Sequence, residues 1–182
     1  MNKIEIQLSK TKLLLGIIGS ILFVIGGIWL FTHPNDFQNI PFRILKNPIA
    51  IKSVGIASVI FFGGTFIYGI KKMFDKTIGL TVDENGIFDN TNASSVGLIN
   101  WKDITAIKTQ QVASTKFLLI YTANPDYYLE RVSGFKRKLL QGNNKVYGTP
   151  FSITSNTLKY NFSELEKLLM ERFDEQQKMP NR

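Results

Sequence analysis

The sequence predicts an α+β protein in two parts. Residues 1–76 hold an N-terminal segment and a transmembrane helical hairpin, and residues 77–182 form a soluble antiparallel β domain capped by a C-terminal helix. Two charge-free apolar stretches, at about 13–31 and 53–70, predict the hairpin. Alternating apolar residues after residue 77 predict the strands, and a helical apolar pattern near the end of the chain predicts the last helix.

The first apolar stretch, residues 13–31, has the length of a membrane-spanning helix, about 28 Å at 1.5 Å per residue. Lys3, Lys10 and Lys12 precede it, as basic residues also precede a signal peptide. The apolar run is longer than a signal-peptide core, however, and no small-residue cleavage site follows Trp29. We therefore expect a retained helix.

The second apolar stretch, residues 53–70, lies between Lys52 and the pair Lys71 and Lys72. It has no polar face, which argues against a buried helix of a soluble domain. Neither stretch contains an ionisable residue, so a pump, a transporter or a voltage sensor is disfavoured.

Both stretches are rich in small residues, which let helix backbones approach closely in lipid. This pattern predicts that the hairpin packs against itself, and pairing of two copies of the chain is the alternative. The residues expected at the contact are Gly16, Ser20 and Gly27 in the first helix and Ser53, Ala57 and Gly64 in the second.

Positive charge predicts the orientation of the hairpin. Six lysines flank its two outer ends, whereas the connecting segment 32–52 carries three basic residues. Because the side of a membrane protein with more Lys and Arg usually faces the cytoplasm, both outer ends of the hairpin are expected there. Together with a composition rich in Lys, Asn, Ile and Phe, this predicts a multi-pass protein of a bacterial inner membrane with both termini in the cytoplasm. The flanking lysines are Lys3, Lys10, Lys12, Lys71, Lys72 and Lys76, against Arg43, Lys46 and Lys52 in the connection.

The soluble part begins with a predicted hairpin, strands 78–82 and 87–88 around the turn 83–86. Strand-like segments at 96–99, 104–107 and 116–121 extend it into an antiparallel meander. Trp101 follows the third segment, and we interpret it as a core residue.

Helical and strand-like segments alternate in the remainder of the domain. Asn124 and Pro125 predict a helix start, and Gly142 is expected to end the helical region. Gly134 weakens its middle, so the region is predicted to form either one helix or two short pieces. Strand-like segments return at 149–154 and 158–162.

The C-terminal helix is predicted to open with a capping box of Ser163 and Glu166. An apolar stripe follows, and we expect it to cover an open end of the sheet. The stripe consists of Leu165, Leu168, Leu169 and Phe173.

Two segments, residues 80–87 and 96–104, resemble bacterial pleckstrin-homology-like domains attached to paired membrane helices. In that family a similar strand–turn–strand is followed by a hydrophobic-Trp-x-Asp-Ile step. The chain as a whole also resembles a group of bacterial two-helix membrane proteins. The resemblance implies a pleckstrin-homology-like antiparallel sheet or partly open barrel capped by a C-terminal helix, and little about activity.

The inventory of reactive residues disfavours catalysis. The chain has no cysteine and one histidine, His33, so a thiolate metal site, a zinc enzyme or a His-based triad is not expected. No phosphate loop, dinucleotide fingerprint or nucleophile elbow is present. We expect a protein that is not an enzyme, with no cofactor and no metal.

The net charge of +8 suits membrane lipids with anionic headgroups, whereas no groove-reading motif indicates nucleic acid. The densest basic cluster is Lys136, Arg137 and Lys138. We favour its interpretation as a solvated helix face whose apolar residues pack on the domain's own core, because charge runs are usually solvated, and contact with anionic lipid is the alternative. The acidic turn 83–86 argues against phosphoinositide binding there. The candidate lipid-binding residues are Lys71, Lys72, Lys136, Arg137 and Lys138.

The sequence thus favours a non-enzymatic, membrane-anchored binding module, an adaptor or sensor with an unknown protein partner. A homo-oligomer is possible on the small-residue pattern. One alternative is an immunity or protective protein against a membrane-active toxin, for which an adjacent toxin gene would be expected. The other is an anionic-lipid-binding protein.

Overall fold

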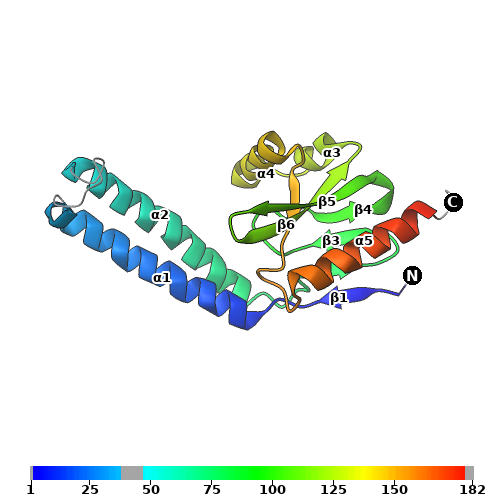
Figure 1. Ribbon diagram of the computed structural model, residues 1–182, viewed down its shortest axis with the longest axis horizontal. Coiled ribbons are helices and arrows are strands. Elements are labelled where there is room, and N and C mark those ends of the chain that lie inside the picture. Colours follow the sequence, from blue (N-terminus) through cyan, green and yellow to red (C-terminus); the bar gives the residue numbers. More distant parts are fainter. Residues whose placement is uncertain (1, 38–46, 179–182) are drawn as a thin grey trace. The chain divides into compact units, whose positions relative to one another are not determined.

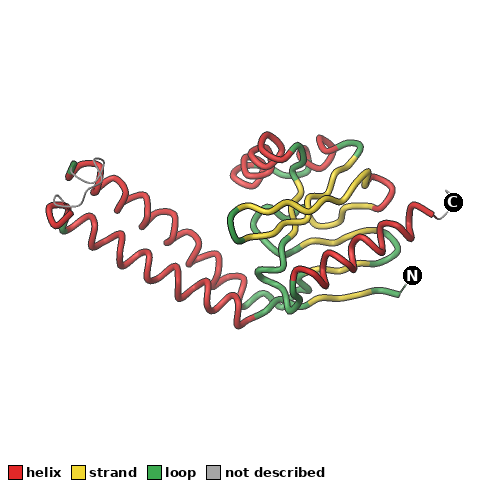
Figure 2. Tube along the Cα trace, in the orientation of Figure 1, coloured by secondary structure: helices red, strands yellow, loops and turns green. Residues whose placement is uncertain are grey.

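The computed structural model describes residues 2–37 and 47–178. The chain divides into two compact units, one made of residues 10–76 and the other of residues 1–9 together with 77–182 (Figures 1 and 2). The basic residues Arg43 and Lys46 of the connecting segment lie outside the described residues.

The first unit is a helical hairpin of α1 (Lys10–Thr32) and α2 (Pro48–Met73), with a short 3-10 turn, η1 (Pro34–Phe37), after α1. The Asn47 side chain accepts a hydrogen bond from the Ile49 amide and so caps the start of α2. Both helices are long and apolar enough to cross a membrane. Each begins before and ends after the stretch predicted for it, 13–31 for α1 and 53–70 for α2.

The second unit contains a four-stranded antiparallel sheet in the order β1-β2-β3-β4. Its strands are β1 (Ile4–Ile6), β2 (Leu80–Val82), β3 (Gly86–Asp89) and β4 (Gly97–Asn100). β2, β3 and β4 follow one another along the chain, as the sequence predicts. β1 comes from the other side of the hairpin in sequence and pairs with β2, Ile4 opposite Val82.

This strand corrects the expected boundary, which assigned the N-terminal residues to the anchor. Ile6 and Leu8 are buried, Leu8 forms a β-bridge with Leu158, and the Lys159 amide donates to the Gln7 carbonyl oxygen. Three residues are too short a run for an alternating pattern to be recognised, and the pairing partner lies beyond the whole hairpin.

The second sheet is three-stranded and antiparallel, in the order β5-β6-β7. The short turn η3 (Trp101–Asp103) leads into β5 (Ile104–Val112), followed by β6 (Thr115–Thr122) and β7 (Phe151–Ile153). The described strands therefore form two antiparallel sheets and no closed barrel. Residues 158–162 were expected as a strand, but only an isolated β-bridge at Leu158 is found there, and Phe162 already belongs to the last helix.

Two helices lie between β6 and β7: α3 (Pro125–Glu130) and α4 (Gly134–Tyr147). The Asn124 side chain accepts from the Tyr127 amide, which confirms the predicted start of α3. The expected end of the following helix at Gly142 is wrong. α4 continues to Tyr147 and ends at Gly148, whose φ of 73° is a conformation that glycine adopts freely.

The C-terminal helix, α5 (Phe162–Lys178), buries Leu165 and Leu169 completely. Its capping box is displaced by two residues from the predicted one. Asn161 Oδ1 accepts from the Glu164 amide, and the Glu164 carboxylate accepts from the Asn161 amide. Glu166 instead accepts a hydrogen bond from the Thr109 hydroxyl of β5, which joins α5 to the second sheet.

Candidate functional site

The contact between α1 and α2 is centred on two glycines that let the backbones approach. A Cβ on Gly27 would lie 2.9 Å from the Gly55 carbonyl oxygen, and a Cβ on Gly55 would lie 2.6 Å from the Gly27 carbonyl oxygen. Any larger residue at either position would push the helices apart, because small residues are what permits backbones to approach this closely.

Hydroxyl groups and aromatic rings extend this contact along the hairpin. Ser58 Oγ of α2 donates to the Phe23 carbonyl oxygen of α1 at 3.0 Å, and the hydroxyls of Ser20 and Thr65 lie 3.2 Å apart. The rings of Phe23 and Phe62 stack with their centroids 4.2 Å apart. Such interhelical hydrogen bonds hold helices together where water is absent.

The small residues at this contact are only partly the predicted ones. Ser20 and Gly27 are buried, whereas a Cβ on Gly16 would have no neighbour within 4 Å. The residues expected in α2 lie on an exposed face instead: Ser53, Ala57 and Gly64. Small residues occupy more than one face of α2, so helical spacing alone could not identify the face that packs; the contact uses Gly55, Ser58, Thr65 and Gly69.

The candidate cations at the end of α2 have different surroundings. Lys71 is exposed, whereas Lys72 Nζ forms an ion pair with Asp75 Oδ2 at 2.9 Å. Lys72 is also buried, at 6% exposure. Lys72 is therefore engaged within the protein, and Lys71 is the cation of this pair that faces outward.

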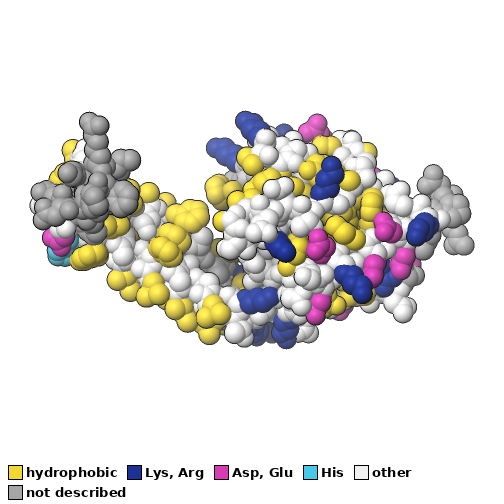
Figure 3. Space-filling model, in the orientation of Figure 1, with side chains coloured by type: hydrophobic (Ala, Val, Ile, Leu, Met, Phe, Trp, Pro, Cys, Tyr) yellow, Lys and Arg dark blue, Asp and Glu magenta, His cyan; other side chains and the backbone are white. Residues whose placement is uncertain are grey.

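The basic cluster of α4 is divided by the geometry of the helix. Successive residues turn by about 100°, so Lys136, Arg137 and Lys138 point in three directions. Lys138 and Lys145, two turns apart, share the side of α4 opposite to the fully buried Leu140. In Figure 3 dark blue side chains project from the edge of the domain where Figure 1 draws α4.

The hydrophobic-Trp-x-Asp-Ile step is a structural element. Trp101 is 5% exposed and its indole Nε1 donates to the Asp83 carbonyl oxygen, which confirms its interpretation as a core residue. Asp103 Oδ2 accepts from the Tyr128 hydroxyl at 2.7 Å, and that hydroxyl accepts from the Asn100 amide. Burial, together with the hydrogen bond to Asp103, raises the pKa of Tyr128.

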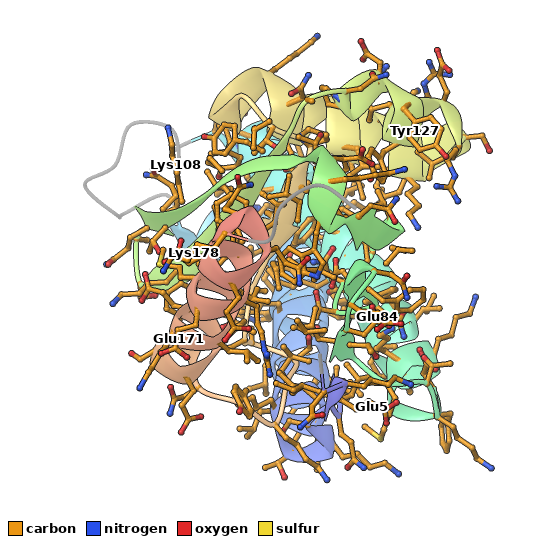
Figure 4. The ribbon with its side chains drawn as sticks, turned by 90° about the vertical axis from the view of Figure 1, so that its right-hand side faces the viewer. Glu5, Glu84, Lys108, Tyr127, Glu171 and Lys178 are labelled. Carbon is orange, nitrogen blue, oxygen red and sulfur yellow. The ribbon has the colours of Figure 1, made fainter. Side chains whose placement is uncertain are left out.

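The acidic turn 83–86 is occupied by its own hydrogen bonds. Asp83 Oδ1 accepts from the amides of Asn85 and Gly86. Glu84 lies in the same turn, on a different part of the domain from Tyr127 of α3 (Figure 4). Within residues 2–37 and 47–178, no group of three or more His, Cys, Asp or Glu side chains is arranged to hold a metal ion.

These features define an α+β protein with two antiparallel sheets, a C-terminal helix and two N-terminal apolar helices that have the length to span a membrane. No protein family, curated protein or solved structure matches the chain.

Proposed function

We propose that the chain is a non-enzymatic, membrane-anchored binding module, an adaptor or sensor. It presents a pleckstrin-homology-like domain at the cytoplasmic face of a bacterial inner membrane to a protein partner. The observation that carries this proposal is the pairing of β1 with β2. β1 precedes the hairpin in the sequence and β2 follows it, so the same sheet is joined through the chain to the start of α1 and to the end of α2.

The exposed surface of the hairpin supports its insertion in lipid. Many of its large apolar side chains are open to solvent, among them Ile60 at 71%, Phe61 at 65% and Leu22 at 63%. A contiguous apolar surface of this kind is unfavourable in water and favourable in hydrocarbon. If both helices span, strands that pair must lie on the same side of the membrane, and the lysine bias favours the cytoplasm as that side.

The pleckstrin-homology-like assignment is supported by the arrangement of the domain. Two antiparallel sheets are followed by a helix that buries Leu165 and Leu169, as the resemblance implies. The Trp101–Asp103 turn connects one sheet to the other and is held by Asp83 and Tyr128.

The proposed surface for the protein partner is the outer half of β5. This strand is one of the two edges of its sheet, and Lys108 to Val112 are exposed. An edge strand offers unpaired backbone N–H and C=O groups to an added strand. Anchoring in one membrane raises the effective concentration of a partner that is anchored there too.

Site-specific photocrosslinking in cells tests this proposal. A photoreactive residue at Gln110 of β5 should give one reproducible crosslinked product, because a partner strand would lie against it. The matched control is Glu171, an exposed position of α5. No product at Gln110, or the same products at both positions, would contradict the assignment of β5 as the binding edge.

A further inference from the structure

The outward face of α4 combines the two most exposed large apolar side chains of the described domain. Phe135 is 75% exposed and Val146 is 72% exposed, whereas Leu140, on the opposite side of the helix, is fully buried. α4 is thus attached to the domain through Leu140, and its apolar outer residues do not contribute to the core. The sequence-based interpretation, in which the apolar residues of this helix pack inward, holds for Leu140 and in part for the half-buried Leu139, but not for Phe135.

The same helix is uniformly basic. α4 carries Lys136, Arg137, Lys138 and Lys145 and no acidic residue. The adjoining α3 adds Asp126 and Glu130, and Arg131 follows it. The segment 125–147 therefore has five basic and two acidic residues. The three acidic residues labelled in Figure 4, Glu5, Glu84 and Glu171, lie in other parts of the chain.

The positions of the charged and apolar side chains on α4 match those of an interfacial helix. At about 100° per residue, Phe135 and Val146 lie within about 20° of each other on the helix surface. Lys138 and Lys145 lie beside them, displaced by about 60–100° towards one flank. Helices that lie in a membrane interface carry an apolar strip bordered by Lys or Arg in this way.

We propose that the outward face of α4 docks on the anionic headgroups of the membrane that holds the hairpin. Phe135 and Val146 enter the interface, and Lys138 and Lys145 contact the phosphates. The proposal rests on the membrane anchoring in the proposed function and names a lipid contact that the adaptor role does not require. The proposed lipid contacts are therefore Lys138 and Lys145, two helical turns apart, and not the three consecutive residues 136–138 expected from the sequence.

The length of the connections favours a lipid surface as the occupant. Residues 7–9 join β1 to α1 and residues 74–79 join α2 to β2. At about 3.5 Å per residue they extend to about 10 Å and about 20 Å, so chain length alone holds the domain close to the membrane. A basic face on a domain held there meets anionic lipid at high effective concentration.

Fluorescence quenching on the full-length chain tests the proposal. Because the chain has no cysteine, V146C can be labelled at a single site with an environment-sensitive dye. The protein is reconstituted into vesicles of phosphatidylcholine, with or without phosphatidylglycerol, and the dye is quenched by nitroxide-labelled lipid. V112C, on the exposed end of β5, is the matched labelling control.

We expect strong quenching at V146C only in phosphatidylglycerol vesicles, and little at V112C in either kind. Each lysine near an anionic surface contributes about a fivefold factor, so K138Q/K145Q should weaken docking by roughly 25-fold. The control double variant K167Q/K178Q removes the same charge from exposed positions of α5 and should leave quenching unchanged.

Two results would overturn the proposal: no difference between V146C and V112C, or quenching that is independent of phosphatidylglycerol and of Lys138 and Lys145. Shielding of V146C that depends on protein concentration would assign this face to a second copy and would also overturn it. Resistance of the same samples to alkaline extraction checks the hairpin. A chain that is extracted refutes the proposed function itself, whereas an inserted chain with a water-exposed V146C refutes only the docking.

Discussion

Tyr128 links α3 to the turn between the two sheets through a single hydroxyl group. That hydroxyl donates to Asp103 Oδ2 and accepts from the Asn100 amide, and the ring is 2% exposed. A buried polar group that loses its partner costs more than the hydrogen bond itself contributes. Removal of the Tyr128 hydroxyl oxygen alone should therefore change the free energy of unfolding measurably.

We predict that Y128F lowers the free energy of unfolding by about 1–3 kcal/mol at neutral pH, because Asp103 and Asn100 lose their partner. The measurement is denaturant unfolding in detergent. Y127F, which removes the hydroxyl of an exposed neighbouring tyrosine, is the control and should change little. Equal stability of Y128F and the parent would show that the Asp103 contact contributes nothing.

The raised pKa of Tyr128 also gives stability a pH dependence with a defined sign. The folded state holds the phenol proton more tightly than the unfolded state. The resulting stability is fully present below the ordinary tyrosine pKa of 10.0 and is lost as the pH rises through the folded pKa. Y128F should lack this part of the alkaline loss when unfolding is measured across that range.

The N-terminus of α5 provides a second test at the level of one residue. Because Asn161, and not Ser163, caps the helix, N161A should destabilise the domain by about 1 kcal/mol. S163A should change the unfolding midpoint by much less, since Ser163 is exposed within the first turn. A larger loss of stability in S163A than in N161A would contradict this assignment and would support the capping box of Ser163 and Glu166 expected from the sequence.

Among the elements, the hairpin depends on which face of α2 meets α1. G55V should force the helices apart, because a Cβ there meets the Gly27 carbonyl oxygen and the Phe31 amide nitrogen. G64V adds the same side chain where no atom lies within 4 Å and is the matched control. Disulfide formation between F23C and F62C, whose rings stack, should fall in G55V membranes and persist in G64V membranes.

Elements with strong local signals were predictable from the sequence. The two apolar helices, the β2–β3 hairpin, the Asn124 cap and the apolar stripe of α5 depend on residues close together in the chain. β1 was not predictable, because a three-residue strand has no clear period and its partner follows the hairpin. Gly142 was expected to end α4, but a Cβ there would meet no atom within 4 Å, and the helix ends instead at Gly148, which has a positive φ.

The sequence predicted that the candidate lipid-binding residues are basic, but not which of them lie side by side in the structure. Because they are consecutive in the sequence, Lys136, Arg137 and Lys138 were predicted to form one cluster. On a helix, however, the residues that share a face are three, four or seven positions apart. Lys145 therefore joins Lys138 only once α4 is known to continue past Gly142. The ion pair of Lys72 with Asp75 likewise depends on where α2 ends.

At the scale of the whole molecule, the order of the elements along the chain constrains the topology. The chain passes from β1 through the two apolar helices α1 and α2 to β2, which pairs with β1 in the same sheet. Two spanning helices bring the chain back to its starting side, so this order is compatible with insertion. A single spanning helix would separate β1 from β2 and leave both without their partner.

Cysteine accessibility in intact bacterial cells measures this topology directly. Single cysteines replace Asn2, Asp36 and Lys178 in a chain that has none of its own, and a membrane-impermeant maleimide is applied before and after lysis. We predict that position 36 reacts from outside and that positions 2 and 178 react only after lysis. Labelling of positions 2 and 178 from opposite sides, or recovery of the chain in the soluble fraction, would contradict a sheet continuous with both ends of a membrane hairpin.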